Sequence, residues 1–170
     1  MLQAKDIVLR ALEPEDLDFL FKIENNTSLW ELSSTQTPFS KHILKQYLAN
    51  AQQDIYEAKQ LRLIIETDKQ AIGMIDLFDF DPQHKRAGIG ILIAEKYQSK
   101  GYATKAIELI IEYAFSVLDL HQLYANITKD NFKSRALFTK SGFKQIGVKK
   151  DWIFTKNQFK DEILFQLIKN

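Results

Sequence analysis

The sequence predicts a mixed α/β protein built on one sheet. Short apolar runs typical of strands alternate with helical spacings up to residue 142, and residues 143–168 then indicate two or more antiparallel strands. This order of elements describes a mixed sheet covered by helices. Because the 170 residues contain neither a repeat nor a linker-like tract, we expect a single domain over residues 1–170.

The first quarter of the chain predicts one strand and two helices. Residues 7–12 form an apolar run, and Pro14 then fixes φ at the start of a helix that extends to Glu24. Ser40 is a predicted N-cap, because a second helical apolar spacing follows it.

The middle of the chain predicts the centre of the sheet. Residues 61–66 and 71–80 are predicted strands, and the polar turn at 67–70 between them indicates a hairpin. The run at 87–94 is almost continuously apolar, which is typical of a strand buried on both faces.

The second half predicts two helices separated by a strand. From Ala103, apolar residues recur at the three-and-four spacing of an amphipathic helix, and a strand at 123–127 follows. Residues 131–140 form a shorter predicted helix. Gly142 ends that helix, since glycine readily adopts the left-handed conformation of a C-terminal cap.

Composition excludes several classes of partner and site. Lys and Arg number 23 against 22 Asp and Glu, so the net charge of +1 provides no field to hold nucleic acid or anionic lipid. The absence of cysteine excludes a disulfide and a thiolate zinc site, and we expect no bound metal. No signal-peptide core or run of ~20 apolar residues is present. We therefore expect a cytoplasmic protein without a nucleic-acid or membrane partner.

The segment Gln98–Ala103 lies between a predicted strand and the strongest predicted helix. The first turn of a helix has unpaired N–H donors and a partial positive charge, so it can bind phosphate without a basic side chain. Gly101 allows close approach, because a Cβ at that position would displace the phosphate. This segment indicates either a simple tight turn or an anion-binding loop.

Two ordered motifs favour the anion-binding loop. Gln98-x-x-Gly101-x-Ala103 resembles the Gln/Arg-x-x-Gly-x-Gly/Ala signature of the GNAT superfamily of N-acetyltransferases. A second segment resembles the second GNAT motif: Asn131-x-x-Ser134-x-x-Leu137-Phe138-x-Lys140-x-Gly142-Phe143. The resemblance extends over nearly the whole chain and is greatest to the subgroup of ribosomal-protein N-terminal and spermidine/spermine N-acetyltransferases.

The resemblance implies a fold, a reaction and a set of cofactor contacts. It implies a mixed, mostly antiparallel sheet with about four helices, in which the strands at 87–94 and 123–127 splay apart to admit pantetheine. The implied reaction transfers an acetyl group from acetyl-CoA to a primary amine by direct attack in a ternary complex. The implied cofactor residues are Ile91, Leu92, Ile93, Gln98, Ser99, Lys100, Gly101, Tyr102, Ala103, Thr104, Asn131 and Ser134. Helix N-capping is an equal interpretation of Asn131.

Two positions depart from the pattern of the superfamily. Phe138 stands where many relatives have the tyrosine proposed to protonate the thiolate, and Gly88 stands where many have a glutamate base. Neither phenylalanine nor glycine can transfer a proton, so another group or solvent must do so. The departures also leave open a CoA-binding module without catalysis.

Several residues are candidates for the acceptor site. Asp76 alternates with apolar neighbours on the strand before the splay, so it is the candidate base or amine contact. Asp79, His84 and His121 are further candidates for the base. Together with Asp76 and Asp79, the candidate substrate contacts include two residues from the acceptor wall of relatives, Trp30 and Glu31.

The acceptor itself stays open at the level of the sequence. A polyamine or another small amine, a protein N-terminus and an aminoglycoside-like compound all present a suitable amine. Core packing explains Trp30 as well as acceptor binding does, and a homo-oligomer is compatible with the composition.

Overall fold

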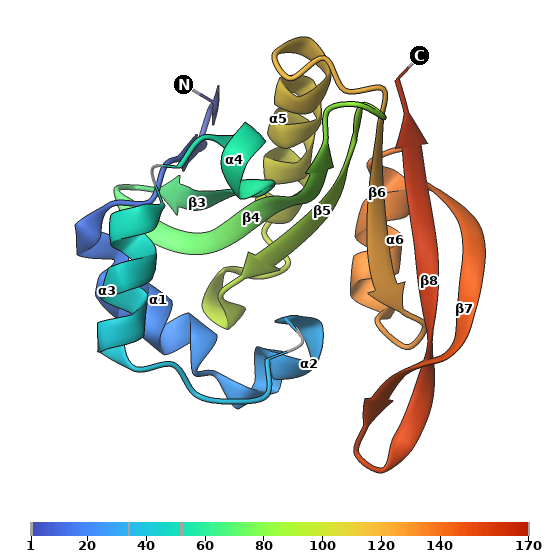
Figure 1. The fold of residues 1–170 in the computed structure, drawn as a ribbon, viewed down its shortest axis with the longest axis horizontal. Helices are drawn as coiled ribbons and strands as arrows, with labels where there is room; N and C mark the ends of the chain where they lie inside the picture. Colours follow the sequence, from blue (N-terminus) through green and yellow to red (C-terminus); the bar gives the residue numbers. More distant parts are fainter. Residues whose placement is uncertain (1, 34, 52, 170) are drawn as a thin grey trace.

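The structure is a computed structural model that describes residues 2–33, 35–51 and 53–169. Its centre is one eight-stranded sheet with the strand order β1-β2-β3-β4-β5-β6-β8-β7 (Figure 1). Neighbouring strands pair antiparallel except for β5 and β6, which are parallel. The strands are β1 (Leu2–Ala4), β2 (Ile7–Arg10), β3 (Leu61–Thr67), β4 (Gln70–Asp81), β5 (Arg86–Ile93), β6 (Gln122–Thr128), β7 (Lys144–Thr155) and β8 (Gln158–Ile168). The predicted mixed, mostly antiparallel α/β fold is confirmed.

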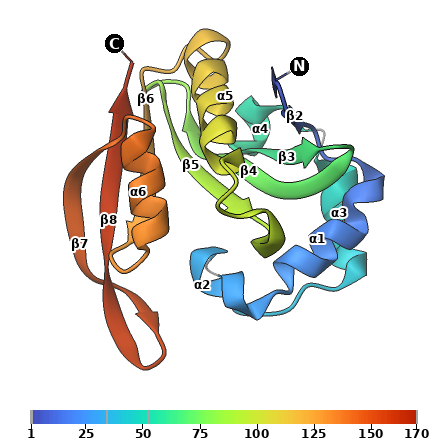
Figure 2. The ribbon, with the colours of Figure 1, turned by 180° about the vertical axis from the view of Figure 1, so that it is seen from behind.

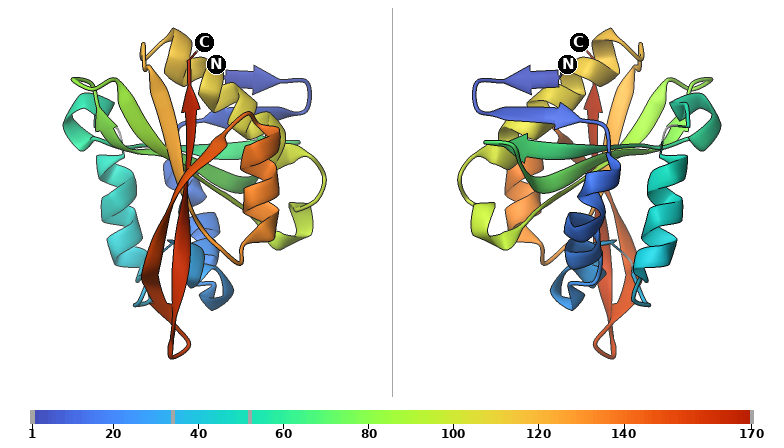
Figure 3. Two further views of the ribbon diagram at one scale, coloured as in Figure 1. Left: turned by 90° about the vertical axis from the view of Figure 1, so that its right-hand side faces the viewer. Right: turned by 90° about the vertical axis from the view of Figure 1, so that its left-hand side faces the viewer.

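Helices cover both faces of the sheet. The helices α5 and α6 lie on one face (Figure 2), and α1 and α3 lie on the other (Figure 3). The helices are α1 (Leu17–Glu24), α2 (Trp30–Ser33), α3 (Lys41–Asn50), α4 (Ile55–Ala58), α5 (Tyr102–Ser116) and α6 (Phe132–Lys140). Single 3-10 turns lie at Pro14–Asp16, Thr27–Leu29 and Glu95–Tyr97. The four longer helices were predicted, whereas the one-turn helices α2 and α4 are additional. No helix in the described ranges is long and apolar enough to cross a membrane.

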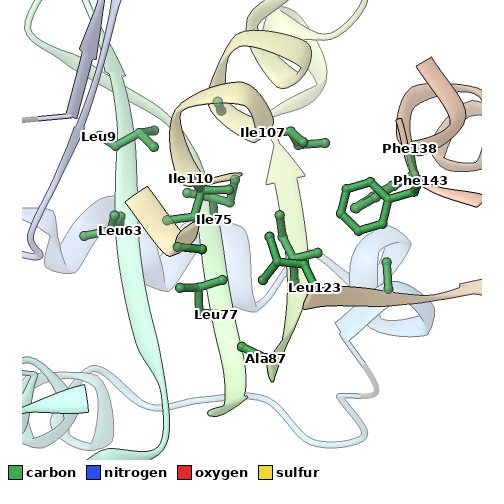
Figure 4. Packing of buried hydrophobic residues seen from close by; sticks show 14 of the residues in the cluster. Leu9, Leu63, Ile75, Leu77, Ala87, Ile107, Ile110, Leu123, Phe138 and Phe143 are labelled. Atoms are coloured by element: carbon green, nitrogen blue, oxygen red, sulfur yellow. The ribbon is translucent and has the colours of Figure 1, made fainter. Parts of the chain in front are cut away.

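Successive side chains of β4 point to opposite faces of the sheet and so contribute to two separate hydrophobic cores. Ile75 and Leu77 are fully buried against α5, where Ile107 and Ile110 face them (Figure 4). The intervening residues of β4 point to the opposite face, which α1 and α3 cover. This alternation places Asp76 on the α1 and α3 face, between the two buried residues of the α5 face.

The parallel strands β5 and β6 pair over their first residues and then separate. Their register ends with Gly88 opposite Tyr124. Beyond that row β5 continues to Ile93, whereas β6 stays paired with β8 up to Thr128. Figure 1 shows the two strands diverging toward α2. The predicted splay is therefore present at the centre of the sheet.

Candidate active site

The loop before α5 has the backbone geometry of an anion-binding site. Ser99 and Gly101 both have positive φ, 61° and 83°, within three residues of each other. Gly101 is the N-cap of α5 and makes no side-chain capping bond to the amides of the first turn. The Gln98 side-chain amide donates a hydrogen bond of 3.0 Å to the carbonyl of Ile93, which ties the loop to the end of β5. Successive amides in such conformations form a concave cradle for an anion.

A cavity of about 430 Å³ lies against this loop and reaches α6. All of the predicted cofactor residues except Lys100 line it. Lys100 is exposed, and its ammonium lies 5.4 Å from the ring centroid of Tyr97. The lining residues that sequence reasoning missed are Leu29, Leu32, Tyr97, Lys133, Ala136, Leu137 and Lys140.

Two of the missed residues, Lys133 and Lys140, carry positive charge from α6 to the cavity. Their spacing of seven residues, two helical turns, could have identified them as one face of that helix. Lysines on this face suit a cofactor that carries several phosphates.

Asn131 occupies the junction between two cavities. Its side-chain oxygen accepts a hydrogen bond of 3.1 Å from the backbone N–H of Ser134, so the N-cap interpretation is confirmed. Both residues line the larger cavity and a second one of about 120 Å³. Leu32 and Ile91 also line both, so the two cavities adjoin.

The smaller cavity lies inside the splay. It is bounded by residues 89–91 of β5 and 125–128 of β6, and Phe138 of α6 closes one side. Two carboxylates of the described chain, Glu31 and Glu162, also line it. The cavity therefore combines an apolar wall with two carboxylate side chains at the place where the two strands separate.

Both carboxylates are held by lysines of the β7–β8 hairpin. Glu31 contacts the ammonium of Lys160 at 2.5 Å, and Glu162 contacts that of Lys149 at 2.5 Å. Sequence reasoning proposed Glu31 and missed Glu162. The strand pattern of β8 gave no signal for Glu162, because it is the last of three consecutive charged residues, 160–162, a run that is typical of an exposed stretch.

The other predicted acceptor residues lie outside both cavities. Asp76 accepts hydrogen bonds of 2.7 and 2.9 Å from Arg62, whose third nitrogen binds Glu24 at 2.8 Å. Trp30 donates its indole N–H to the carbonyl of Glu24 at 2.8 Å. Asp79, His84 and His121 are exposed and line neither cavity. Asp76 is therefore part of a half-buried ion cluster on the α1 and α3 face, and both of its oxygens are engaged.

The Phe78 ring explains why position 88 is occupied by glycine. A Cβ at Gly88 would lie 2.2 Å from the nearest atom of the Phe78 ring, and Tyr124 packs edge-on against that ring with centroids 5.8 Å apart. The ring thus occupies the space that a side chain at position 88 would need.

We expect Gly88→Ala to lower the free energy of unfolding by about 1–3 kcal/mol, because the Phe78 ring must move away from Tyr124. Urea denaturation of the wild type and the variant measures this. In the double variant with Phe78→Leu, the added cost of Gly88→Ala should shrink. A urea midpoint of Gly88→Ala equal to that of the wild type would contradict the close contact between position 88 and the Phe78 ring.

Tyr124 closes the end of the splay and binds Asp79. Its hydroxyl donates to the Asp79 carboxylate at 3.2 Å, and burial together with that carboxylate raises the pKa of Tyr124 to about 12. The folded state therefore binds the phenol proton more tightly than the unfolded chain, where the pKa is about 10. This contribution to stability is complete below pH 10 and is lost as the pH rises toward 12.

We expect the ultraviolet phenolate titration of the wild type, minus that of Tyr124→Phe, to show a midpoint near pH 12. Asp79→Asn should lower that midpoint, because the neighbouring negative charge is removed. A Tyr124 midpoint that does not respond to Asp79→Asn would contradict the contact.

Comparisons with known proteins agree with this geometry. Residues 6–144 match the family model for an acetyltransferase (GNAT) domain. Spermidine N(1)-acetyltransferase from Escherichia coli (strain K12) is 31% identical over 163 residues, which cover 96% of this chain and 86% of the relative. A crystal structure of spermidine N-acetyltransferase from Vibrio cholerae in complex with CoA and spermine has a TM-score of 0.88 at 26% identity, covering 97% and 96% of the two chains. A dodecameric structure of that enzyme has a TM-score of 0.81 at 28% identity, with coverages of 97% and 95%.

Proposed function

The chain belongs to the GNAT acetyltransferase family, and we propose that it transfers the acetyl group of acetyl-CoA to a primary amine of a polyamine. The observation that carries the proposal is the meeting of two cavities at Asn131 and Ser134. One cavity has an anion-binding loop, and the other has carboxylates inside the splay. A thioester and an amine that enter from these two sides meet at the junction.

The residues around the larger cavity suit acetyl-CoA. When bound, it supplies an activated acetyl group as a thioester. The amides at 101–104 bind the pyrophosphate, and the separated edge of β5 at 91–93 offers backbone groups to the pantetheine. Asn131 uses its side-chain oxygen as a helix cap, which leaves its amide N–H groups for the cofactor.

The smaller cavity suits a slender cationic acceptor. A volume of about 120 Å³ accommodates an alkylamine arm more readily than a branched peptide. Glu31 and Glu162, each paired with one lysine, present carboxylate oxygens to an ammonium group that enters. The names of the relatives support a polyamine, since one is a spermidine N(1)-acetyltransferase and another was solved with spermine. We assign Asp76 to an ion cluster with Arg62 and Glu24 that lies outside both cavities and carries a net negative charge.

Proton transfer uses groups other than those of many relatives. Phe138 lines the cavity without a hydroxyl, and Phe78 fills the space over Gly88. The amine must lose its proton before it attacks, since free alkylamines are mostly protonated at neutral pH. We propose that Glu31 and Glu162 orient the amine, and that solvent takes the amine proton and supplies a proton to the leaving thiolate.

A panel of acceptors tests the proposal. We expect kcat/KM for spermidine and spermine to exceed that for a monoamine of equal chain length by at least about tenfold, because each extra ammonium adds a charge-assisted contact. The preference should fall with added salt. If a peptide N-terminus is acetylated faster than either polyamine, the acceptor assignment is wrong although the transferase activity stands.

We further propose that the β7–β8 hairpin mediates a homo-oligomer. Trp152, Phe154 and Phe159 are exposed by 59–62%, and large exposed apolar surfaces usually mark interfaces. A relative forms a dodecamer. Light scattering should give the wild type a mass above that of one chain and Phe154→Glu a smaller mass. A monomeric wild type at micromolar concentration would contradict the proposal.

A further inference from the structure

The helix α2 lacks an apolar anchor of its own. None of the side chains of Thr27–Leu29 or of Trp30–Ser33 is buried, and Leu32 is 55% exposed. Segments with few buried apolar contacts open locally at low free-energy cost. The Trp30 indole N–H ties the start of α2 to α1 through the carbonyl of Glu24, and Leu29 packs partly against the core beneath α1 and α3. A second interaction, on the side of the cavity, holds Glu31.

Lys160 supplies that interaction from the far end of the sequence. Its ammonium lies 2.5 Å from a Glu31 oxygen and 2.6 Å from an Asp130 oxygen. The Lys160 side chain is only 15% exposed. The Thr155 hydroxyl adds a longer contact of 3.4 Å to Glu31. Hydrogen bonds to Asp130 and to Glu31 raise the pKa of Lys160, so the ammonium stays charged through the neutral range.

Of the two carboxylates that share this ammonium, Glu31 lines the smaller cavity, whereas Asp130 lies outside it, next to Asn131 in the chain. Glu31 lines the cavity from α2. Asp130 directly precedes Asn131, which caps α6 and lines both cavities. Figure 1 shows α2 facing the β7–β8 hairpin across the opening of the splay. The Lys160 ammonium thus connects Glu31 of α2 to the residue before the N-cap of α6, the helix that borders the larger cavity.

We propose that Lys160 is a positioning residue that fixes α2 to the N-terminus of α6 and so sets the shape of the acceptor cavity. Most exposed ion pairs contribute about 0–1 kcal/mol. Lys160 differs from such pairs because its side chain is only 15% exposed and its ammonium bonds two carboxylates. Its effect on the reaction passes through Glu31 and Asn131, and that part of the proposal rests on the proposed function.

Hydrogen exchange measured by mass spectrometry tests the positioning role without any acceptor. We expect Lys160→Gln to speed exchange in peptides spanning 27–33 by about tenfold and to leave the buried strand at 72–77 unchanged. Lys160→Arg should stay close to the wild type, since a guanidinium can also bridge two carboxylates. The matched control is Lys150→Gln, which removes a 73% exposed lysine of the same hairpin that contacts Asp161.

Equal exchange at 27–33 in the wild type and Lys160→Gln would overturn the proposal, and so would an equal rise in Lys150→Gln. Kinetics provide a second readout. Lys160→Gln should lower kcat/KM for the acceptor about tenfold, because α2 and Glu31 are no longer held in place. Lys160→Arg should keep kcat/KM close to the wild-type value. A wild type that exchanges as expected but acetylates no polyamine would reject the proposed acceptor and leave the positioning role intact.

Discussion

Gly101→Leu is expected to weaken the binding of CoA by about a hundredfold. The loss corresponds to about two charge-assisted hydrogen bonds between loop amides and phosphate. No described atom beyond the two chain neighbours lies within 4 Å of a Cβ at Gly101, so the first carbon of the new side chain fits without a clash. Because Gly101 lines the larger cavity, we expect the added side chain to occupy space before α5 that the phosphates need. The protein itself bears the strain of a left-handed residue with φ of 83°, about 1–2 kcal/mol.

Gly142→Leu is the matched control for that backbone strain. Gly142 has φ of 92° at the end of α6, and a Cβ there would make an ordinary contact of 3.5 Å with Leu167. Both variants should lose similar thermal stability, whereas titration calorimetry with CoA should separate them. Equal affinities for CoA in the two variants would show that the loop at 98–104 does not hold the phosphates.

Arg62→Met is expected to lower the free energy of unfolding by about 3 kcal/mol or more. The substitution leaves Glu24 and Asp76 half-buried without their shared guanidinium, and breaking such a cluster from one side is costly. Tyr47, whose ring centroid lies 5.7 Å from the guanidinium carbon, also loses a cation–π contact. Urea denaturation at neutral pH measures the change.

Two further variants isolate the charge effect. Adding Asp76→Asn to Arg62→Met should recover part of the stability, because one unpaired carboxylate is removed. Lys85→Met breaks an exposed pair with Asp119, whose side chains are 55% and 71% exposed, and should change stability by less than about 0.5 kcal/mol. Similar decreases in the free energy of unfolding for Arg62→Met and Lys85→Met would contradict the larger contribution that we assign to the cluster of Arg62, Glu24 and Asp76.

The cofactor loop could be predicted because its signals are contiguous in the sequence. A strand, Gly101 and a helix follow one another directly, so local geometry brings the amides together. The acceptor cavity has no such signal, since Glu31 and Glu162 come from opposite ends of the chain and meet only through the fold. The periodicity of apolar residues predicts helices and strands, but it does not show which distant residues the fold brings together.

Asp76 shows what the strand pattern alone could not specify. Alternation correctly places its side chain on the face opposite Ile75, but it does not identify the neighbour across the hairpin. A register shift between Ile65 and Glu66 places Arg62 opposite Asp76. With the unshifted register of Thr67 and Gln70, Arg62 would pair with Ile75 instead. A one-residue bulge thus places the side chain of Asp76 beside that of Arg62, in an ion cluster that alternation could not predict.

Detection of N-acetylspermidine by mass spectrometry, after incubation of the wild-type enzyme with acetyl-CoA and spermidine, tests the central claim most directly. We predict a product that accumulates in proportion to enzyme and that Gly101→Leu forms far more slowly at limiting acetyl-CoA. Absence of acetylated spermidine, together with normal binding of acetyl-CoA, would contradict the claim that the cavity in the splay of β5 and β6 accepts a polyamine.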